Sequence, residues 1–256
     1  MKRFKLISLL FLIIITILFI LLNKETTRKI AINYKIFEYK LPVHLKINDF
    51  FNRHYNYKNL VKLINTNQNN NKFIILNTSK WVNQNIKKIP EDVDIVDHHP
   101  LTIVHRRLGS QDQFSDILSV LLFYSDIDSF FIKNFDDIIH PLTFFKVNNY
   151  WSVLDPYYGV YFINENENFA SIEELKTSKW EIVNLDSQKK NFLNISDLFS
   201  NKFRNYREVK KYYKKIFIHL QTSDEIDEIN IFERGGRSYT QKPLNRLNFE
   251  IYKLFK

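Results

Sequence analysis

The sequence contains no cysteine. This absence excludes disulfide bonds, thiolate metal sites and catalysis by a thiol. Glycine is also scarce, with 4 residues, whereas there are 23 phenylalanines and 14 tyrosines. With 256 residues, 45% of them hydrophobic, the chain is long enough for one sizeable domain, with or without an appendage.

The formal net charge of +9 is weak evidence for a polyanionic partner. Asn, Lys and Ile recur in runs such as "INTNQNNNK", which is typical of drift toward A/T-rich codons rather than of selection for charge. The sequence also has no recognisable nucleic-acid-binding motif. We therefore expect no nucleic-acid partner.

The first 29 residues predict a membrane anchor. Residues 6–22 are apolar except for Ser8 and Thr16, and this length is about the minimum that spans a bilayer core. A cleaved signal peptide would need a small-residue cleavage site, which "LLNKETTRK" lacks. Three basic residues precede the apolar run, while Glu25 dilutes the basic charge that follows it. We therefore expect a single-pass protein of the cytoplasmic membrane with residues 1–29 as anchor and most of the chain outside the cytoplasm.

Residues 30–72 are mixed and polar, and they predict only short elements and an exposed loop at "NTNQNNN". The spacing of apolar residues next predicts a helix over 73–89, with Trp81 packed in the core. A second amphipathic helix follows Gly109 in "HRRLGSQDQFSDILSVLL". It should open at or just after Ser110, which forms a capping box with Gln113.

A hairpin is predicted in "HPLTFFKVNNYWSVLDPYYGVYF", residues 140–162. Two runs rich in aromatic and β-branched residues surround Asn148 and Asn149, which tolerate the positive φ of a two-residue turn. In that register Phe145 faces Ser152.

The same register brings a histidine and an aspartate together. Leu142 faces Asp155, and His140 shares the face of Leu142, so Asp155 lies diagonally beside His140. An imidazole oriented by a carboxylate is the base-and-orienter half of a nucleophilic triad. A His and an Asp on hairpin strands are also common without any such role, and Asp155 before Pro156 starts turns well.

No metal site or cofactor is expected. His98, His99 and His105 lie near three acidic residues, but their spacing matches no zinc pattern. We interpret this stretch as a solvated acidic loop with incidental imidazoles.

Four motifs in this order resemble the transglutaminase-like superfamily, relatives of the papain-like thiol enzymes. They are "WVNQNI", "GSQDQFSDILSVLL", "HPLTFFKV" and "YWSVLDPYYGV", and the resemblance covers roughly residues 73–165. It implies an α+β fold in which the helix bearing the nucleophile position packs on an antiparallel sheet. It also implies a domain over residues 30–185.

The resemblance assigns site residues as well. His140 takes the place of the family's histidine and Asp155 that of its aspartate. The motif positions around these two residues are matched by Trp151 and Pro156, and the glycine positions of the pattern by Gly109 and Gly159. Trp151 is thereby a candidate ligand-binding residue.

The sequence differs from the family pattern at the position of the nucleophile. Gln111 occupies the position of the family's cysteine, and a carboxamide is no nucleophile. Ser110, one residue away, is an alternative nucleophile only if the helix start rotates by roughly 100° relative to the family. Its ordinary role is the N-cap of the helix.

Residues 186–256 predict a basic helical extension. In "NYREVKKYYKKIFIHLQ" apolar and basic residues fall on different sides, which suits either a docked helix with a solvated basic face or contact with anionic lipid headgroups. "ERGGRSYTQKPLNR" predicts a loop, from which Arg237 would hold a carboxylate or phosphate or serve only a structural turn.

These features together predict a membrane-anchored transglutaminase-like domain that binds rather than catalyses. A peptide, a peptidoglycan fragment or a surface-polysaccharide component is the expected kind of ligand. The alternatives are a serine-type hydrolase or acyltransferase using Ser110, His140 and Asp155, and a structural subunit of a cell-envelope assembly.

Overall fold

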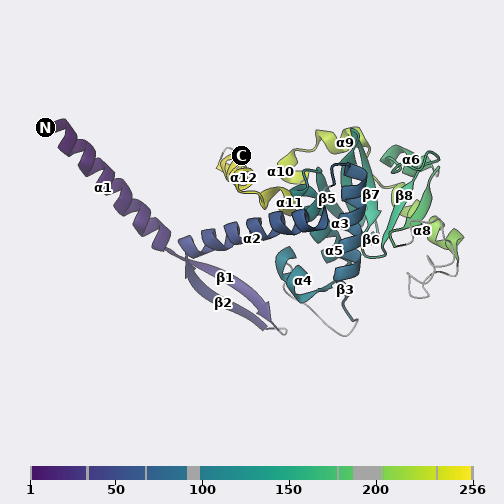
Figure 1. The fold of residues 1–256 in the computed structure, drawn as a ribbon, viewed down its shortest axis with the longest axis horizontal. Coiled ribbons are helices and arrows are strands. Elements are labelled where there is room, and N and C mark those ends of the chain that lie inside the picture. Colours follow the sequence, from purple (N-terminus) through teal and green to yellow (C-terminus); the bar gives the residue numbers. More distant parts are fainter. Residues whose placement is uncertain are drawn as a thin grey trace.

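A computed structural model describes residues 2–32, 35–66, 68–90, 99–177, 179–186, 203, 205–234 and 236–254 (Figure 1). The chain is an α+β protein. Its helices are α1 (Lys2–Asn23), α2 (Val43–Ile64), α3 (Asn71–Asn85), α4 (Pro100–Arg106), α5 (Gln111–Tyr124), α6 (Ile172–Thr177), α8 (Tyr206–Phe217), α9 (Ser223–Glu228), α10 (Ile231–Arg234), α11 (Gly236–Thr240) and α12 (Pro243–Leu254). Its strands are β1 (Glu25–Ile32), β2 (Lys35–Pro42), β3 (Lys87–Lys88), β4 (Leu108–Gly109), β5 (Ser129–Phe135), β6 (Ile138–Val147), β7 (Tyr150–Asp155), β8 (Val160–Ile163) and β9 (Glu181–Asn184).

The N-terminal helix α1 stands away from the body of the molecule (Figure 1). Its segment Leu6–Asn23 has a mean hydropathy of 3.0, is long and apolar enough to cross a membrane, and has no buried part. So much exposed apolar surface is stable in lipid and unstable in water.

The segment after the anchor differs from the sequence prediction. β1 and β2 pair as an antiparallel hairpin, and α2 runs unbroken for 22 residues where only short elements were expected. In α2, Tyr57 and Val61 near its C-terminal end are buried, whereas most of its N-terminal half is exposed. A helix that is packed at one end only does not show a continuous apolar stripe, so its length was not evident from periodicity.

The sheet at the centre of the molecule is antiparallel and has the order β5-β6-β7-β8-β9. Asn148 and Asn149 have φ angles of 48° and 67°, as a two-residue turn of this hand requires. Phe145 pairs with Ser152, so the register predicted for the hairpin is confirmed.

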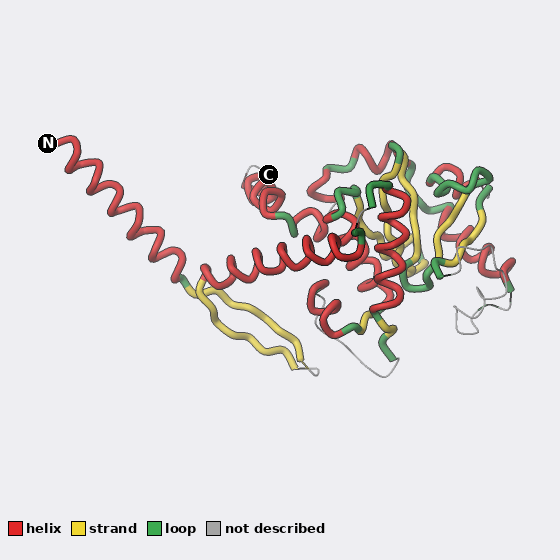
Figure 2. Tube along the Cα trace, in the orientation of Figure 1, coloured by secondary structure: helices red, strands yellow, loops and turns green. Residues whose placement is uncertain are grey.

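Both faces of this sheet are covered, as Figure 2 shows, with the strands between layers of helix. Phe145 and Leu154 pack with α3 and α5 on one face. Phe144 and Val153, one residue away along each strand, pack with α6 and α8 on the other face. Burial on both faces explains why the strands are nearly continuous apolar runs instead of alternating apolar and polar residues.

The described residues after 185 do not form a separate extension. Helix α8 buries Val209, Tyr213, Ile216 and Phe217 in the core beneath the sheet, so this half of the sheet would be exposed without it. Because the apolar side of α8 is docked, Lys211, Lys214 and Lys215 are exposed on its other side. This arrangement agrees with the interpretation of α8 as a docked helix with a solvated basic face. Helix α8 lies at the opposite end of the molecule from α1 (Figure 1).

The stretch predicted as an arginine-rich loop is also different. Arg234, Arg237 and Arg246 lie on α10, α11 and α12. Glycine and proline suggested a loop, but here Pro243 occupies the first turn of a helix, where its missing N–H costs no hydrogen bond.

Candidate functional site

The N-terminus of α5 forms one wall of the site. Ser110 is its N-cap, and the Ser110 backbone N–H donates to Gln113 Oε1 at 3.1 Å, so the predicted capping box is confirmed. The preceding Gly109 lies so close to the core that a Cβ there would meet Ile86 Cγ2 at 3.1 Å. Local capping and a close backbone approach together place Gln111 at the first turn of the helix.

Gln111, His140 and Asp155 meet at the ends of β6 and β7. His140 Nε2 lies 2.6 Å from Asp155 Oδ2, and Gln111 Nε2 lies 3.0 Å from His140 Nδ1. The structure therefore brings Gln111 into hydrogen-bond contact with the His140–Asp155 pair. His140 is 2% exposed and Asp155 is fully buried.

Asp155 is a four-fold acceptor. Besides the imidazole, its Oδ2 accepts from the Tyr213 hydroxyl at 2.8 Å, and its Oδ1 accepts from the backbone N–H groups of Tyr157 and Tyr158, each at 3.0 Å. A buried carboxylate needs this many donors to offset its loss of hydration. The aspartate therefore connects the hairpin, the turn between β7 and β8, and helix α8.

Two adjacent tyrosines of α8 cover the pair, and the sequence did not predict their role. The Tyr212 hydroxyl lies 3.0 Å from His140 Nδ1, the atom that Gln111 also contacts. Burial and the charge of Asp155 raise the pKa of Tyr212 to about 12 and that of Tyr213 well above its ordinary value of 10, so both remain protonated donors at neutral pH. Tyr158 stacks on the imidazole, with ring centroids 5.9 Å apart.

Lys88 is a further neighbour that the sequence did not single out. Its Nζ lies 4.4 Å from the ring centroid of Tyr157 and 4.9 Å from that of Tyr158, a cation–π arrangement. Burial lowers the pKa of Lys88, and the charge of Asp155 opposes this effect. The pairing of Lys88 with Gly109 across β3 and β4 holds the lysine at the start of α5.

The hydrogen bonds define what the imidazole can do. With its Nε2–H donated to Asp155, His140 keeps a lone pair on Nδ1, which is the state of a general base. The two groups within hydrogen-bond distance of Nδ1 are an amide and a phenol, and neither is an activated nucleophile at neutral pH. The described contacts of Nδ1 therefore include no activated nucleophile.

Ser110 is turned toward a different partner. Its hydroxyl donates to Asp112 Oδ1, and in the described part of the chain it makes no hydrogen bond with His140. This arrangement fits the N-cap role and offers no support for Ser110 as a nucleophile.

Trp151 does not line a binding surface. It is fully buried, and its indole N–H donates to Asp227 Oδ1 at 2.9 Å. The Arg234 guanidinium lies 4.9 Å from the centroid of its rings. Trp151 therefore belongs to the core beneath the sheet.

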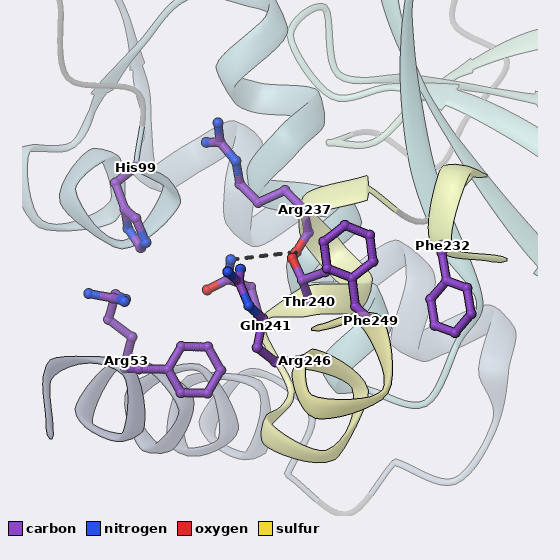
Figure 3. Close-up of a pocket in the computed structure, with 9 residues that line it drawn as sticks. Arg53, His99, Phe232, Arg237, Thr240, Gln241, Arg246 and Phe249 are labelled. Carbon is purple, nitrogen blue, oxygen red and sulfur yellow. Dashed lines mark hydrogen bonds between the residues drawn. The ribbon is translucent and has the colours of Figure 1, made fainter. Parts of the chain in front are cut away.

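Arg237 does not belong to the His140–Asp155 site. It lines a separate pocket of about 570 Å³ between α2, α11 and α12. In Figure 3, Arg53 and His99 reach in from one side and Arg237, Gln241 and Arg246 from the other. The residues that line it are Phe50, Arg53, His99, Phe232, Arg237, Thr240, Gln241, Arg246 and Phe249. None of these nine residues is acidic, so the lining is basic, although Arg237 and Arg246 each pair with a carboxylate outside the lining, Asp116 and Glu250.

Arg237 also has a structural partner. Its Nη1 lies 2.8 Å from Oδ2 of Asp116, whose side chain is 8% exposed. Burial raises the pKa of Asp116 to about 6, while the charge of Arg237 lowers it and that of Asp112 raises it. Burial and the charge of Asp116 also raise the pKa of the Tyr57 phenol.

This raised pKa makes stability depend on pH. Because the pKa of Asp116 is higher in the folded chain than its ordinary 3.8, the folded state binds more protons between pH values of about 4 and about 6. The free energy of unfolding therefore falls as the pH rises through this window, by up to about 3 kcal/mol. We expect Asp116→Asn to remove this fall, as measured by urea unfolding of both proteins at pH 4.5 and 7.5. A stability difference between them that is the same at both pH values would contradict the assignment.

The described residues contain no group of three or more His, Cys, Asp or Glu side chains that could hold a metal ion. His99 caps α4, where its Nδ1 accepts from the Leu101 backbone N–H at 3.3 Å. His98 and the acidic residues before it lie outside the described residues.

Comparisons with family models, with curated proteins and with solved structures find no match to this chain.

Proposed function

We propose that this chain is a membrane-anchored transglutaminase-like domain that has lost its catalytic thiol and binds a component of the cell envelope. Helix α1 anchors it, and the body of the chain lies outside the cytoplasm. The observation that carries the proposal is the contact between Gln111 Nε2 and His140 Nδ1 at 3.0 Å, with Asp155 on the other side of the ring. The residue at the nucleophile position faces the base, but it is a carboxamide.

The chemistry that remains is not that of acyl transfer. A covalent acyl intermediate needs a nucleophile whose proton His140 can take, and neither Gln111 nor Tyr212 supplies one. With Asp155 accepting four hydrogen bonds, the pair instead holds the hairpin and α8 in one rigid unit.

The pocket between α2, α11 and α12 is where the ligand binds. Three arginines and a histidine line it, and three phenylalanines add apolar and aromatic surface. Guanidinium groups bind carboxylates and phosphates through paired N–H donors, and aromatic rings pack against the apolar faces of sugars or peptides. A carboxylate-bearing peptide or glycan of the envelope, such as a peptidoglycan fragment, meets both requirements.

A matched pair of variants tests this pocket. Arg246 and Lys253 both contact Glu250 on α12, at 2.6 Å and 2.7 Å, but only Arg246 lines the pocket. We expect Arg246→Gln to weaken binding of a soluble muropeptide about tenfold or more, because a hydrogen bond to a charged group contributes about 1.5–3 kcal/mol. Lys253→Gln should leave the affinity unchanged.

Isothermal titration calorimetry of the full chain in detergent would measure both affinities. If the muropeptide does not bind, or if the two variants bind it equally well, the pocket is not the ligand site. A stable protein partner that co-purifies with the chain and survives Arg246→Gln would favour the structural-subunit alternative.

A further inference from the structure

Helix α12 has one side that faces the protein. Phe249 and Tyr252 on this side contact Phe232 of α10, with ring centroids 6.1 Å and 4.6 Å away. These aromatic contacts dock the helix on the body of the molecule. They leave the opposite side of α12 without a covering element among the described residues.

That opposite side is apolar. Leu244, Leu247, Ile251 and Leu254 are each between 45% and 82% exposed. They follow the spacing i, i+3, i+7 and i+10, so they form a single stripe along the helix. We call these four residues the leucine stripe of α12. A stripe of large aliphatic side chains left in water is unfavourable, so it is expected to be covered.

The fold places this stripe near the membrane anchor. In Figures 1 and 2, α12 lies on the side of the body from which α1 departs, above the N-terminal half of α2. The pocket confirms this neighbourhood, because Phe50 and Arg53 of α2 line it together with Arg246 and Phe249 of α12. The start of α2 is in turn joined to the end of α1, since the Val43 backbone N–H donates to the carbonyl of Lys24 at 3.0 Å.

We propose that α12 lies in the headgroup region of the bilayer that α1 spans, with its leucine stripe inserted among the upper acyl chains. This inference rests on the proposed anchoring by α1. The charges of the helix are compatible with this location, because Arg246, Glu250 and Lys253 form an ion-paired cluster of net positive charge along one edge of the helix, outside the stripe. The bilayer is favoured over a protein partner because α1 already holds α12 close to a lipid surface.

The absence of cysteine allows a direct test with single-cysteine variants of the full chain. A nitroxide would be attached in turn to Leu247→Cys on the stripe, Ile218→Cys, which is 58% exposed near the far end of α8, and Ile13→Cys within α1. Each labelled chain would be reconstituted into vesicles of equal parts phosphatidylglycerol and phosphatidylcholine. Collision rates with oxygen, which partitions into lipid, and with a water-soluble nickel complex would then be compared.

We expect a severalfold excess of oxygen collisions over nickel collisions at positions 13 and 247, and the reverse at position 218. Oxygen excess at position 13 with nickel excess at position 247 would overturn the proposal for α12 and leave the anchor intact. Nickel excess at both positions 13 and 247 would instead reject the anchor, and the inference with it. A label at position 247 that neither reagent reaches would show that a second copy or another protein covers the stripe, which also overturns the proposal.

Discussion

Gln111→Cys should yield a thiol that iodoacetamide alkylates faster than a free thiol near neutral pH. The new side chain would stand at the first turn of α5, where Gln111 now lies 3.0 Å from His140 Nδ1. A helix N-terminus and a neighbouring imidazole that can become charged both stabilise a thiolate, and they lower a thiol pKa from about 8.5 to about 3.5–7.5. Near pH 6.5 we expect about a tenfold faster reaction, since the larger thiolate fraction outweighs its lower intrinsic nucleophilicity.

The control for this experiment is His140→Ala in the same background. Removing the imidazole should slow alkylation of Gln111→Cys toward the rate of a free thiol, because only the helix N-terminus then remains to stabilise the thiolate. The measurement has no background, since the chain has no other cysteine. A rate equal to that of a free thiol, or one that His140→Ala leaves unchanged, would show that position 111 does not face the His140–Asp155 pair.

Asp155→Ala should destabilise the fold by about 3–5 kcal/mol, which is a large share of the stability of an ordinary domain. The carboxylate accepts from the His140 imidazole, the Tyr213 hydroxyl and two backbone N–H groups, and all of them lie in a buried region. Alanine would leave these donors without an acceptor and would open a small cavity. Urea unfolding of the full chain in detergent, followed by tryptophan fluorescence, measures the loss.

Two further substitutions calibrate this result. Tyr213→Phe removes one of the four donors without changing the packing, so we expect a loss of about 1.5–3 kcal/mol. Asp137→Ala makes the same chemical change as Asp155→Ala on an exposed turn, and its effect should stay within about 0.5 kcal/mol. If Asp155→Ala costs no more than Asp137→Ala, the four hydrogen bonds do not support the hairpin and α8 as described.

The elements that the sequence predicted well are those set by local interactions. The register of β6 and β7 follows from a two-residue turn at Asn148 and Asn149, which both adopt positive φ. The start of α5 follows from a capping box that involves only neighbours three residues apart. The pairing of His140 with Asp155 was therefore predictable, whereas the contact of Gln111 with His140, 29 residues away, also requires α5 to pack on β6.

Arg237 and Trp151 have surroundings that the sequence did not show, because their partners are distant in the sequence. Arg237 was expected to present its guanidinium from a loop, yet it lies on a helix and contacts Asp116, 121 residues away. Trp151 was expected beside a ligand, yet both faces of the sheet are covered and its indole is buried. The local sequence shows that an arginine or a tryptophan is able to bind a ligand, but it does not show which part of the protein will pack against that side chain.

The sequence by itself determined an apolar N-terminal helix, a capped helix with Gln111 at its first turn, and a hairpin that pairs His140 with Asp155, because short-range capping, turn geometry and periodicity decide each of them. Only the tertiary structure decided that α8 closes over this pair through tyrosines 72 and 58 residues away from their partners. It also decided that α2, α11 and α12 enclose a basic pocket. Such contacts form because amphipathic elements bury their apolar faces wherever the whole chain provides a matching surface, and the local sequence does not specify that surface.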